Sequence, residues 1–254
     1  MSALPQPAVR GVGLSQIFEG RTIYKNVSFE VARGQVYAIL GGSGSGKSTL
    51  MKQAIGLLRP AAGRIEVLGR DMYGDRGAGE DDDVLREIGV MFQSGALFGS
   101  MSLLQNVMLP LEMYTDLPLA GREAVARTKL GLVGLADAAD MNPAEVSGGM
   151  TKRAAIARAL ALDPPLLFLD EPSAGLDPIT SAGLDRLILE LRDTLGATFV
   201  VVTHELASIL AIADRCLMLD SVAQGMIAEG DPRELRDSST QPTVRAFFRR
   251  EAMA

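Results

Sequence analysis

The stretch that decides the fold of this chain reads Gly41-Gly42-Ser43-Gly44-Ser45-Gly46-Lys47-Ser48, with Thr49 next. It fits the pattern G-x-x-x-x-G-K-[ST] of a phosphate-binding loop, which stands between a strand and a helix. Residues 35–40 form an apolar run typical of a buried strand, and residues 47–58 have the pattern of a helix. The flanking elements therefore match the context that the motif requires.

Such a loop is suited to the phosphates of a nucleoside triphosphate. Its glycines let the backbone bend until the N–H groups point inward, and the N-terminus of the next helix favours negative charge. Lys47 adds a full positive charge, and the hydroxyl of Ser48 suits Mg²⁺. The alternative is a glycine- and serine-rich turn that happens to precede a lysine, which the motifs further along the chain disfavour.

Length and composition indicate a globular protein with a sizeable core. The chain has 254 residues, 47% of them hydrophobic and 22% charged, which suits one domain or one domain with a subdomain. No stretch approaches the roughly 18 apolar residues of a membrane span, and residues 1–7 lack the blocks of a signal peptide. We therefore expect a cytoplasmic chain, which the single cysteine, Cys216, fits as a buried strand thiol. The net charge of −6 argues against a nucleic-acid partner.

Strand and helix patterns predict an α/β fold. Residues 8–31 alternate like two strands joined by a turn at residues 19–21, and residues 64–67 add a strand, so we expect a small antiparallel sheet. Further on, strands alternate with helices, which predicts a parallel sheet with crossover helices. The expected strands lie at 166–169, 198–202 and 216–219, and the expected helices at 179–194 and 205–213.

A helical segment interrupts this core. Residues 94–162 lack clear strands and show helical patterns at 119–132 and 151–162. Residues 243–251 form a basic, helix-like segment near the C-terminus. We expect a helical insertion and a C-terminal tail in addition to the α/β core.

Two carboxylates follow the expected strand at residues 166–169. Asp170 and Glu171 would stand at the carboxyl edge of the parallel sheet, where ligands bind in open α/β folds. Asp170 suits Mg²⁺, usually through a water, and Glu171 suits a general base that accepts a proton from an attacking water. The alternative is a strand end with two solvated acids before Pro172.

Three further motifs could reach the same site. Ser147-Gly148-Gly149-Met150 opens an alanine-rich helix whose N-terminus could take an anion, although an ordinary N-cap has the same residues. Phe92-Gln93-Ser94 follows an apolar stretch. The only histidine, His204, follows the expected strand at 198–202. A lone histidine at a strand end is more often structural, but this strand end faces the predicted phosphate site.

In order and spacing, these motifs resemble those of the nucleotide-binding subunit of an ABC transporter, and the resemblance covers nearly the entire chain. The matching residues are Lys47 and Ser48 in the Walker A loop, Gln93 in the Q-loop, Ser147, Gly148 and Gly149 in the signature motif, Asp170 and Glu171 in the Walker B motif, Asp177 in the D-loop, and His204 as the switch histidine. Gln93 is also implied near the metal. Phe18 matches the position where the family stacks an aromatic ring on adenine, with a core aromatic as the alternative.

The resemblance implies an α/β, ABC-type P-loop ATPase with a RecA-like parallel-sheet core, an antiparallel β subdomain and a helical subdomain at about residues 94–162. The ATPase domain would span residues 1–236, followed by a tail at 237–254. ATP and Mg²⁺ are implied as ligands. Two copies would close head to tail, so that each ATP lies between the phosphate loop of one copy and the signature helix of the other, with Glu171 as base and His204 on the γ-phosphate.

The signature motif departs from the family's common L-S-G-G-Q by carrying Val146 and Met150. Valine for leucine is a mild apolar change, whereas methionine for glutamine removes an amide that could form hydrogen bonds. The backbone and the contacts of Ser147 remain, so we still expect hydrolysis.

Within the family, the segment 92–98, the residues 147–155, the stretch 177–180 and the tail at 244–248 are similar to the ATPase of Mla/MCE-type phospholipid transport systems. That similarity implies a permease, an MCE lipid-binding protein and a STAS-domain regulator as partners at the cytoplasmic face of the inner membrane. The implied task is movement of phospholipids between the inner and outer membranes. The segment 93–98 is then a groove for a permease helix or, alternatively, an apolar helix start.

Other functions remain as alternatives. An ABC ATPase for another cargo, such as amino acids, lipoproteins or hydrophobic compounds, would have the same motifs. A DNA-repair or translation ATPase would usually carry two fused nucleotide domains or a long coiled coil, neither of which is seen. A purely regulatory module would lack the general base, yet Glu171 and His204 are both present.

Overall fold

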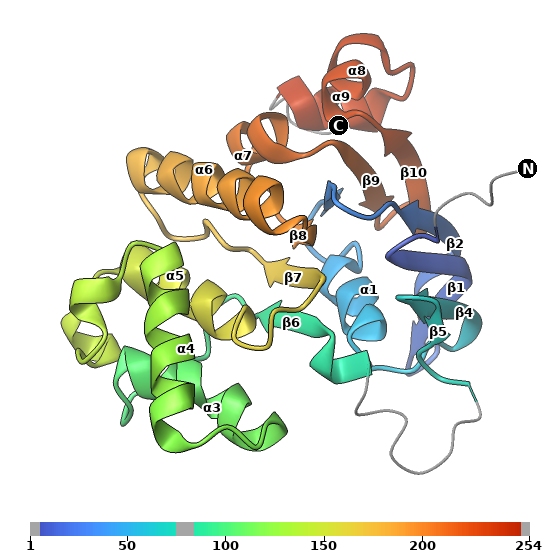
Figure 1. Ribbon diagram of the computed structural model, residues 1–254. Helices are drawn as coiled ribbons and strands as arrows, with labels where there is room; N and C mark the ends of the chain where they lie inside the picture. The colour runs from blue at the N-terminus through green and yellow to red at the C-terminus, as the bar shows by residue number, and fades with distance from the viewer. Residues whose placement is uncertain (1–5, 75–83, 250–254) are drawn as a thin grey trace, which may run out of the picture.

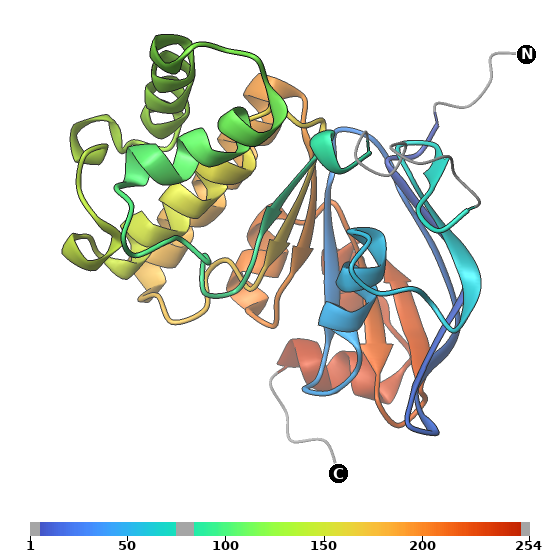
Figure 2. The ribbon, with the colours of Figure 1, turned by 90° about the horizontal axis from the view of Figure 1, so that it is seen from below.

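The computed structural model describes residues 6–74 and 84–249 and contains two β-sheets with helices between and around them (Figures 1 and 2). The six-stranded sheet has the order β10-β9-β3-β8-β7-β6, and the four-stranded sheet has the order β2-β1-β4-β5. Figure 2 shows helix α1 (Lys47–Ala54) between the two sheets and the other large helices beyond the six-stranded sheet. The molecule is therefore layered, as the predicted α/β class requires.

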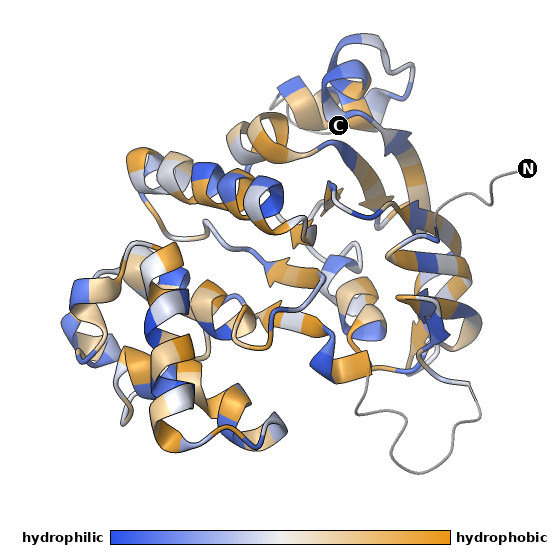
Figure 3. Cartoon of the chain, viewed as in Figure 1, coloured by the Kyte–Doolittle hydropathy of each residue, from blue (hydrophilic) through white to orange (hydrophobic). Residues whose placement is uncertain are grey.

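The six-stranded sheet is parallel except for its edge strand β10, which runs antiparallel to β9. Its inner strands are buried on both faces, which accounts for their continuous apolar runs. Figure 3 shows this apolar character along β7. The strands are β3 (Val36–Gly41), β6 (Ile88–Met91), β7 (Leu166–Asp170), β8 (Thr198–Val202), β9 (Arg215–Asp220) and β10 (Gly225–Gly230).

The four-stranded sheet is antiparallel, as predicted. Its strands are β1 (Val9–Phe18), β2 (Arg21–Val31), β4 (Ala62–Val67) and β5 (Arg70–Asp71). The first two are joined at Glu19 and Gly20, which both have positive φ, so the predicted turn is confirmed. Apolar residues of this sheet, of α1 and of one face of the parallel sheet share one core cluster, which holds α1, the helix after the phosphate loop, between the two sheets.

Helix α1 ends at Ala54, four residues before the predicted end. Gly56 has φ of 80°, and its N–H and that of Leu57 bond back to Gln53 and Lys52. A glycine in the left-handed region after the last helical turn ends helices in this way. The predicted extension to residue 58 is therefore wrong.

The segment between β6 and β7 is helical, as predicted. It contains α3 (Leu103–Tyr114), α4 (Leu119–Leu132), α5 (Gly148–Ala159) and two short 3₁₀ helices, Ala136–Ala138 and Pro143–Glu145. Helix α4 has the predicted bounds. Helix α5 begins at Gly148 with Ser147 as its N-cap, as the residues 147–150 predict, and it ends at Ala159, three residues before the predicted 162. Helix α3 was not predicted.

The remaining helices complete the core. They are α6 (Pro178–Leu195), α7 (Leu206–Ile212), α8 (Pro232–Ser238) and α9 (Pro242–Arg249). Helix α8 runs across residue 236, where the end of the ATPase domain is predicted. Val244 and Phe248 of α9 are buried with Cys216 in a third core cluster, so the predicted tail helix packs on the sheet.

Some predictions fall outside the part of the chain that the structure describes. These are the N-terminal residues 1–5 and the final residues of the predicted tail, from 250 on. Among the described helices, none is long and apolar enough to cross a membrane.

Candidate functional site

The phosphate loop connects β3 to α1, and two of its glycines are sterically required. Gly41 has φ of 144°, and a Cβ there would lie 2.3 Å from the carbonyl oxygen of Leu219. Gly46 has φ of 98°, and its Cβ would lie 2.7 Å from the ring of Tyr24. Gly46 also caps α1 without a side chain, so the first N–H groups of the helix are directed at the loop and are available to an anion.

Lys47 folds back over this loop. Its Nζ donates to the carbonyl oxygens of Gly41 and Gly42 at 2.9 and 3.0 Å. Burial lowers the pKa of Lys47, while the nearby carboxylates of Glu171 and Asp170 act in the opposite direction. The ammonium group is thus held between the loop and the carboxyl end of β7.

Asp170 ends β7 with an oxygen suited to a cation. Within the described residues, its Oδ1 is buried without a hydrogen-bond partner. The pKa of Asp170 is raised, mainly by burial and next by the nearby charge of Glu171. Three lysines, Lys52, Lys47 and Lys152, act in the opposite direction. Magnesium takes one or two carboxylates together with phosphate oxygens and water. No group of three His, Cys, Asp or Glu side chains in residues 6–74 or 84–249 could hold a metal ion, so a cation at Asp170 would depend on oxygens from a phosphate and from water.

Glu171 and His204 meet in the structure. Nδ1 of His204 lies 2.8 Å from Oε1 of Glu171, although the residues are 33 positions apart. Glu171 is 8% exposed, and Oε2 has no hydrogen-bond partner among the described residues. Its φ is 48°, a left-handed conformation that costs about 1–3 kcal/mol in a non-glycine residue. The lone histidine therefore contacts the predicted base, and the base is held in a strained backbone conformation.

A cleft of about 750 Å³ lies beside these residues. It places Gln93, which follows β6, and Asp170, which ends β7, around one space. The lining residues are Lys52, Phe92, Gln93, Ser94, Lys152, Asp170, Ala174 and Gly175. Its two lysines, Lys52 and Lys152, are among the lining residues that were not predicted as site residues. The sequence could have indicated Lys152, because this charged residue lies on the same face of its helix as Gly149 and Ile156, which are buried.

The signature residues point elsewhere. Ser147 caps α5, its Oγ accepting the N–H of Met150 at 3.3 Å, and both Ser147 and Gly148 are exposed. They do not line the cleft. Met150 is half-buried and packs against the core of the helical segment. Within the single chain, Ser147 thus acts as an ordinary N-cap. Ser147 and Gly148 are also accessible to another molecule.

Two further predicted residues have clear surroundings. Asp177 caps α6, its Oδ1 accepting the N–H groups of Ile179 and Thr180 at 3.0 and 3.1 Å. Bonds from Thr180 lower the pKa of Asp177. Phe18 lies at the end of β1 opposite Arg21 and is 42% exposed, so the alternative of a core aromatic is wrong.

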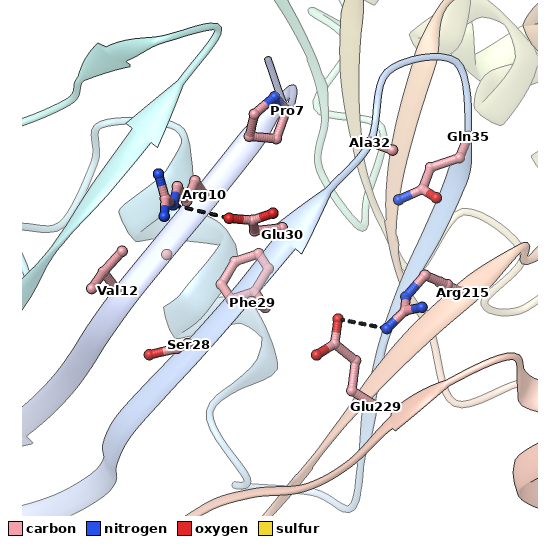
Figure 4. A pocket seen from close by; sticks show the side chains of 11 residues that line it. Pro7, Arg10, Val12, Ser28, Phe29, Glu30, Ala32, Gln35, Arg215 and Glu229 are labelled. Atoms are coloured by element: carbon pink, nitrogen blue, oxygen red, sulfur yellow. Dashed lines mark ion pairs between the residues drawn. The ribbon is translucent and has the colours of Figure 1, made fainter. Parts of the chain in front are cut away.

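A second pocket, of about 660 Å³, lies between the β1–β2 hairpin and the β9–β10 pair (Figure 4). Its charged side chains are paired with one another, Arg10 with Glu30 at 2.9 Å and Arg215 with Glu229 at 3.5 Å. None of the predicted site residues lines it. Its position and its mutually neutralised charges separate it from the phosphate site.

Comparison with known proteins agrees with this geometry. A family model described as "ABC transporter" matches residues 24–174. The intermembrane phospholipid transport system ATP-binding protein MlaF of Escherichia coli K12 is 40% identical over 228 residues, covering 90% of this chain and 83% of that protein. The probable ribonucleotide transport ATP-binding protein mkl of Mycobacterium tuberculosis H37Rv is 40% identical over 236 residues, and the chain spans 65% of its length.

Solved structures with this fold are also ABC proteins. The protein cbiO1 of Clostridium perfringens, part of the ABC transporter complex cbiONQ, has a TM-score of 0.83 and 29% identity, with 91% of each chain covered. A dimeric ATP-binding cassette bound to ADP and Pi has a TM-score of 0.78 and 29% identity, covering 88% of this chain and 98% of that one. Because the family model spans more than half of the chain and relatives about 40% identical align over 90% or more of it, the chain belongs to the ATP-hydrolysing, ATP-binding subunits of ABC transporters.

Proposed function

We propose that this ATPase works as one half of a dimer with Glu171 as its general base, and that the dimer drives a permease that moves phospholipids between the inner and outer membranes. The observation that supports the catalytic part is the 2.8 Å contact between Glu171 and His204, next to Asp170 at the end of β7 and near Lys47 at the start of α1. The carboxylate of Glu171, its partner His204 and the ammonium group of Lys47 would then surround the place where the phosphates bind.

Each residue of the site has its own role in this proposed mechanism. The N–H groups of the loop and Lys47 bind the phosphates. Ser48, Asp170 and Gln93 would hold Mg²⁺, which would withdraw charge from the phosphate oxygens. Glu171 accepts a proton through Oε2 as the oxygen of a water forms a bond to the γ-phosphorus. The bond from the γ-phosphorus to the bridging oxygen breaks, and ADP leaves with that oxygen. His204 holds the carboxylate in line and then contacts the γ-phosphate.

A second copy completes each site in this proposal. Ser147 and Gly148 are exposed and stand outside the cleft, so they suit a nucleotide bound by the facing copy. Asp177 follows Leu176, which would lie 3.7 Å from a Cβ at Gly148, and Phe18 is exposed enough to stack on adenine. The dimeric relative with ADP and Pi supports this arrangement.

The cargo is proposed from the relatives and from the signature motif. MlaF belongs by name to an intermembrane phospholipid transport system, and Met150 together with the segment 92–98 resembles that group. The partners are then a permease, an MCE lipid-binding protein and a STAS-domain subunit at the cytoplasmic face of the inner membrane. The mkl relatives carry the name of a different cargo, ribonucleotides, which makes that cargo the second candidate.

Purification of the intact membrane complex through this subunit tests the cargo. Mass spectrometry of the washed complex should identify a permease, an MCE protein and bound phospholipid. A complex prepared in the same way through the Lys47→Ala variant, which should assemble but not turn over, controls for lipid carried along by the membrane. A complex with a nucleotide-binding periplasmic protein and no specific phospholipid would overturn the lipid proposal while leaving the ATPase assignment intact.

A further inference from the structure

Lys152 links three parts of the site through one ammonium group. It lies on α5, is 8% exposed, and its Nζ donates to the carbonyl oxygens of Gln93 and Glu171, the latter at 3.3 Å. The same cation therefore holds the segment after β6 and the segment after β7 to the helix that begins with the signature residues.

The contact with Glu171 completes the restraint on that residue's backbone. Its N–H donates to the carbonyl oxygen of Val202 in β8 at 2.8 Å. Its own carbonyl oxygen accepts from Lys152 and from the N–H of Ala174 at 3.2 Å. Since φ is 48° at this position, the strained conformation persists only while its surroundings hold both peptide groups.

Helix α5 provides a matched comparison in Arg158. This residue donates to the carbonyl oxygens of Gly95 and Ala96 at 2.8 and 2.7 Å, so it fastens the same loop that Lys152 holds at Gln93. The structure gives Arg158 no hydrogen bond to Glu171 within the described residues. Loss of Arg158 would loosen the loop and leave the Glu171 backbone as it is.

Burying an ammonium group is costly unless its bonds offset the cost. Burial lowers the pKa of Lys152, whereas Glu171 and Asp170 raise it. A methionine would fill a similar volume without that cost, so the cation contributes its hydrogen bonds to the two carbonyl groups and its attraction to the carboxylates of Glu171 and Asp170.

We propose that Lys152 is a positioning residue for hydrolysis, which fixes the backbone of Glu171 relative to Gln93 and so aims the Glu171 carboxylate. The inference rests on the proposed role of Glu171 as base. Lys152 lines the cleft, but its hydrogen bonds go to two backbone carbonyl groups and none goes to a phosphate-loop residue in the described part of the chain, so its loss should slow the chemical step more than it weakens ATP binding.

The test measures ATP hydrolysis by the full-length chain with MgATP, in wild type, Lys152→Met, Lys152→Arg and Arg158→Met. We expect kcat to fall about tenfold or more in Lys152→Met with KM for ATP within about twofold, because charged hydrogen bonds of this kind are strong. Lys152→Arg should recover most of the loss, since a guanidinium can donate to both carbonyls. Arg158→Met should stay within about threefold of wild type.

The outcomes separate this inference from the base assignment. Unchanged kcat in Lys152→Met, an equal fall in Arg158→Met, or a parallel rise in KM would each overturn the positioning role. If Lys152→Met does not fold, as judged by circular dichroism, Lys152→Arg and Lys152→Gln are compared with wild type instead. The expected result is a kcat near wild type for Lys152→Arg and a low kcat for Lys152→Gln. Wild-type turnover in Glu171→Gln would overturn the base itself, whatever Lys152 does.

Discussion

At the scale of single residues, Glu171 is held both by its side chain and by its backbone. His204 contacts Oε1, while β8 and Lys152 hold the two peptide groups on either side of it. Oε2 remains for the proton of the water. A base fixed in this way loses little orientational freedom when the reaction begins, which is the usual source of catalytic advantage in positioned acids and bases.

Replacement of Glu171 by glutamine should separate binding from turnover. The amide has the same shape but accepts a proton poorly, so we expect ATP binding within about threefold of wild type and kcat lower by a factor of about 10² or more. The ATP-bound dimer should therefore accumulate. Size-exclusion chromatography with light scattering, with and without MgATP, measures the dimer, and phosphate release measures turnover.

The matched variant for this prediction is Lys47→Ala. It removes the ammonium group that donates to Gly41 and Gly42 and would contact the phosphates, so tight ATP binding should be lost and no dimer should form with MgATP. Unchanged ATP affinity in Lys47→Ala would contradict the role of the loop, and equal dimerisation of both variants would contradict ATP as the bridge.

At the scale of secondary-structure elements, the close approach of α5 to α6 is set by one glycine. A Cβ at Gly149 would lie 2.5 Å from Cγ2 of Thr180. Thr180 cannot turn away freely, because its Oγ1 bonds to the Oδ2 of Asp177 in the cap of α6. The signature helix and the D-loop are thus coupled by packing within one chain.

Gly149→Val should therefore destabilise the fold. Overpacking of this kind costs about 1–3 kcal/mol, and we expect a corresponding drop in the free energy of unfolding measured by urea titration. Gly148→Val is the control, since a Cβ there would lie 3.7 Å from Leu176, which is ordinary contact. Equal free energies of unfolding for the two variants would show that α6 shifts to accommodate the added side chain without loss of stability.

At the scale of the whole molecule, the C-terminal helices are part of the core. Val244 and Phe248 of α9 are buried against the face of the six-stranded sheet that carries Ala38, Leu40 and Met218. The tail therefore packs against β3, the strand that leads into the phosphate loop.

Phe248→Ala should lower the stability of the entire chain. Truncation of a buried phenylalanine costs about 3–5 kcal/mol, whereas Phe247→Ala, at a half-buried position, should cost less. Thermal unfolding followed by circular dichroism measures both. A single cooperative transition, shifted further in Phe248→Ala, is expected; a separate early transition for the tail would contradict its inclusion in the core.

Sequence patterns predicted the elements best where periodicity was strong and local. Strand β8 and helix α4 have the predicted bounds, because the apolar run at 199–202 and the helical spacing of Ala126 and Leu130 are local signals. Helix α3 was missed, since Pro110 lies inside it and its apolar residues are nearly continuous. The short strands β6 and β10 were also missed, because a strand of this length is recognised only by its pairing in the sheet.

The sequence by itself determined the phosphate loop, the strand that delivers Asp170 and Glu171, and the family, because these depend on neighbouring residues and on backbone freedom within a few positions. The tertiary structure decided which distant residues meet. His204 reaches Glu171 across 33 positions and Lys152 reaches Gln93 across 59, because parallel strands bring their carboxyl ends to one edge and α5 packs beside that edge. No local pattern encodes such meetings, since they follow from the order of strands in the sheet.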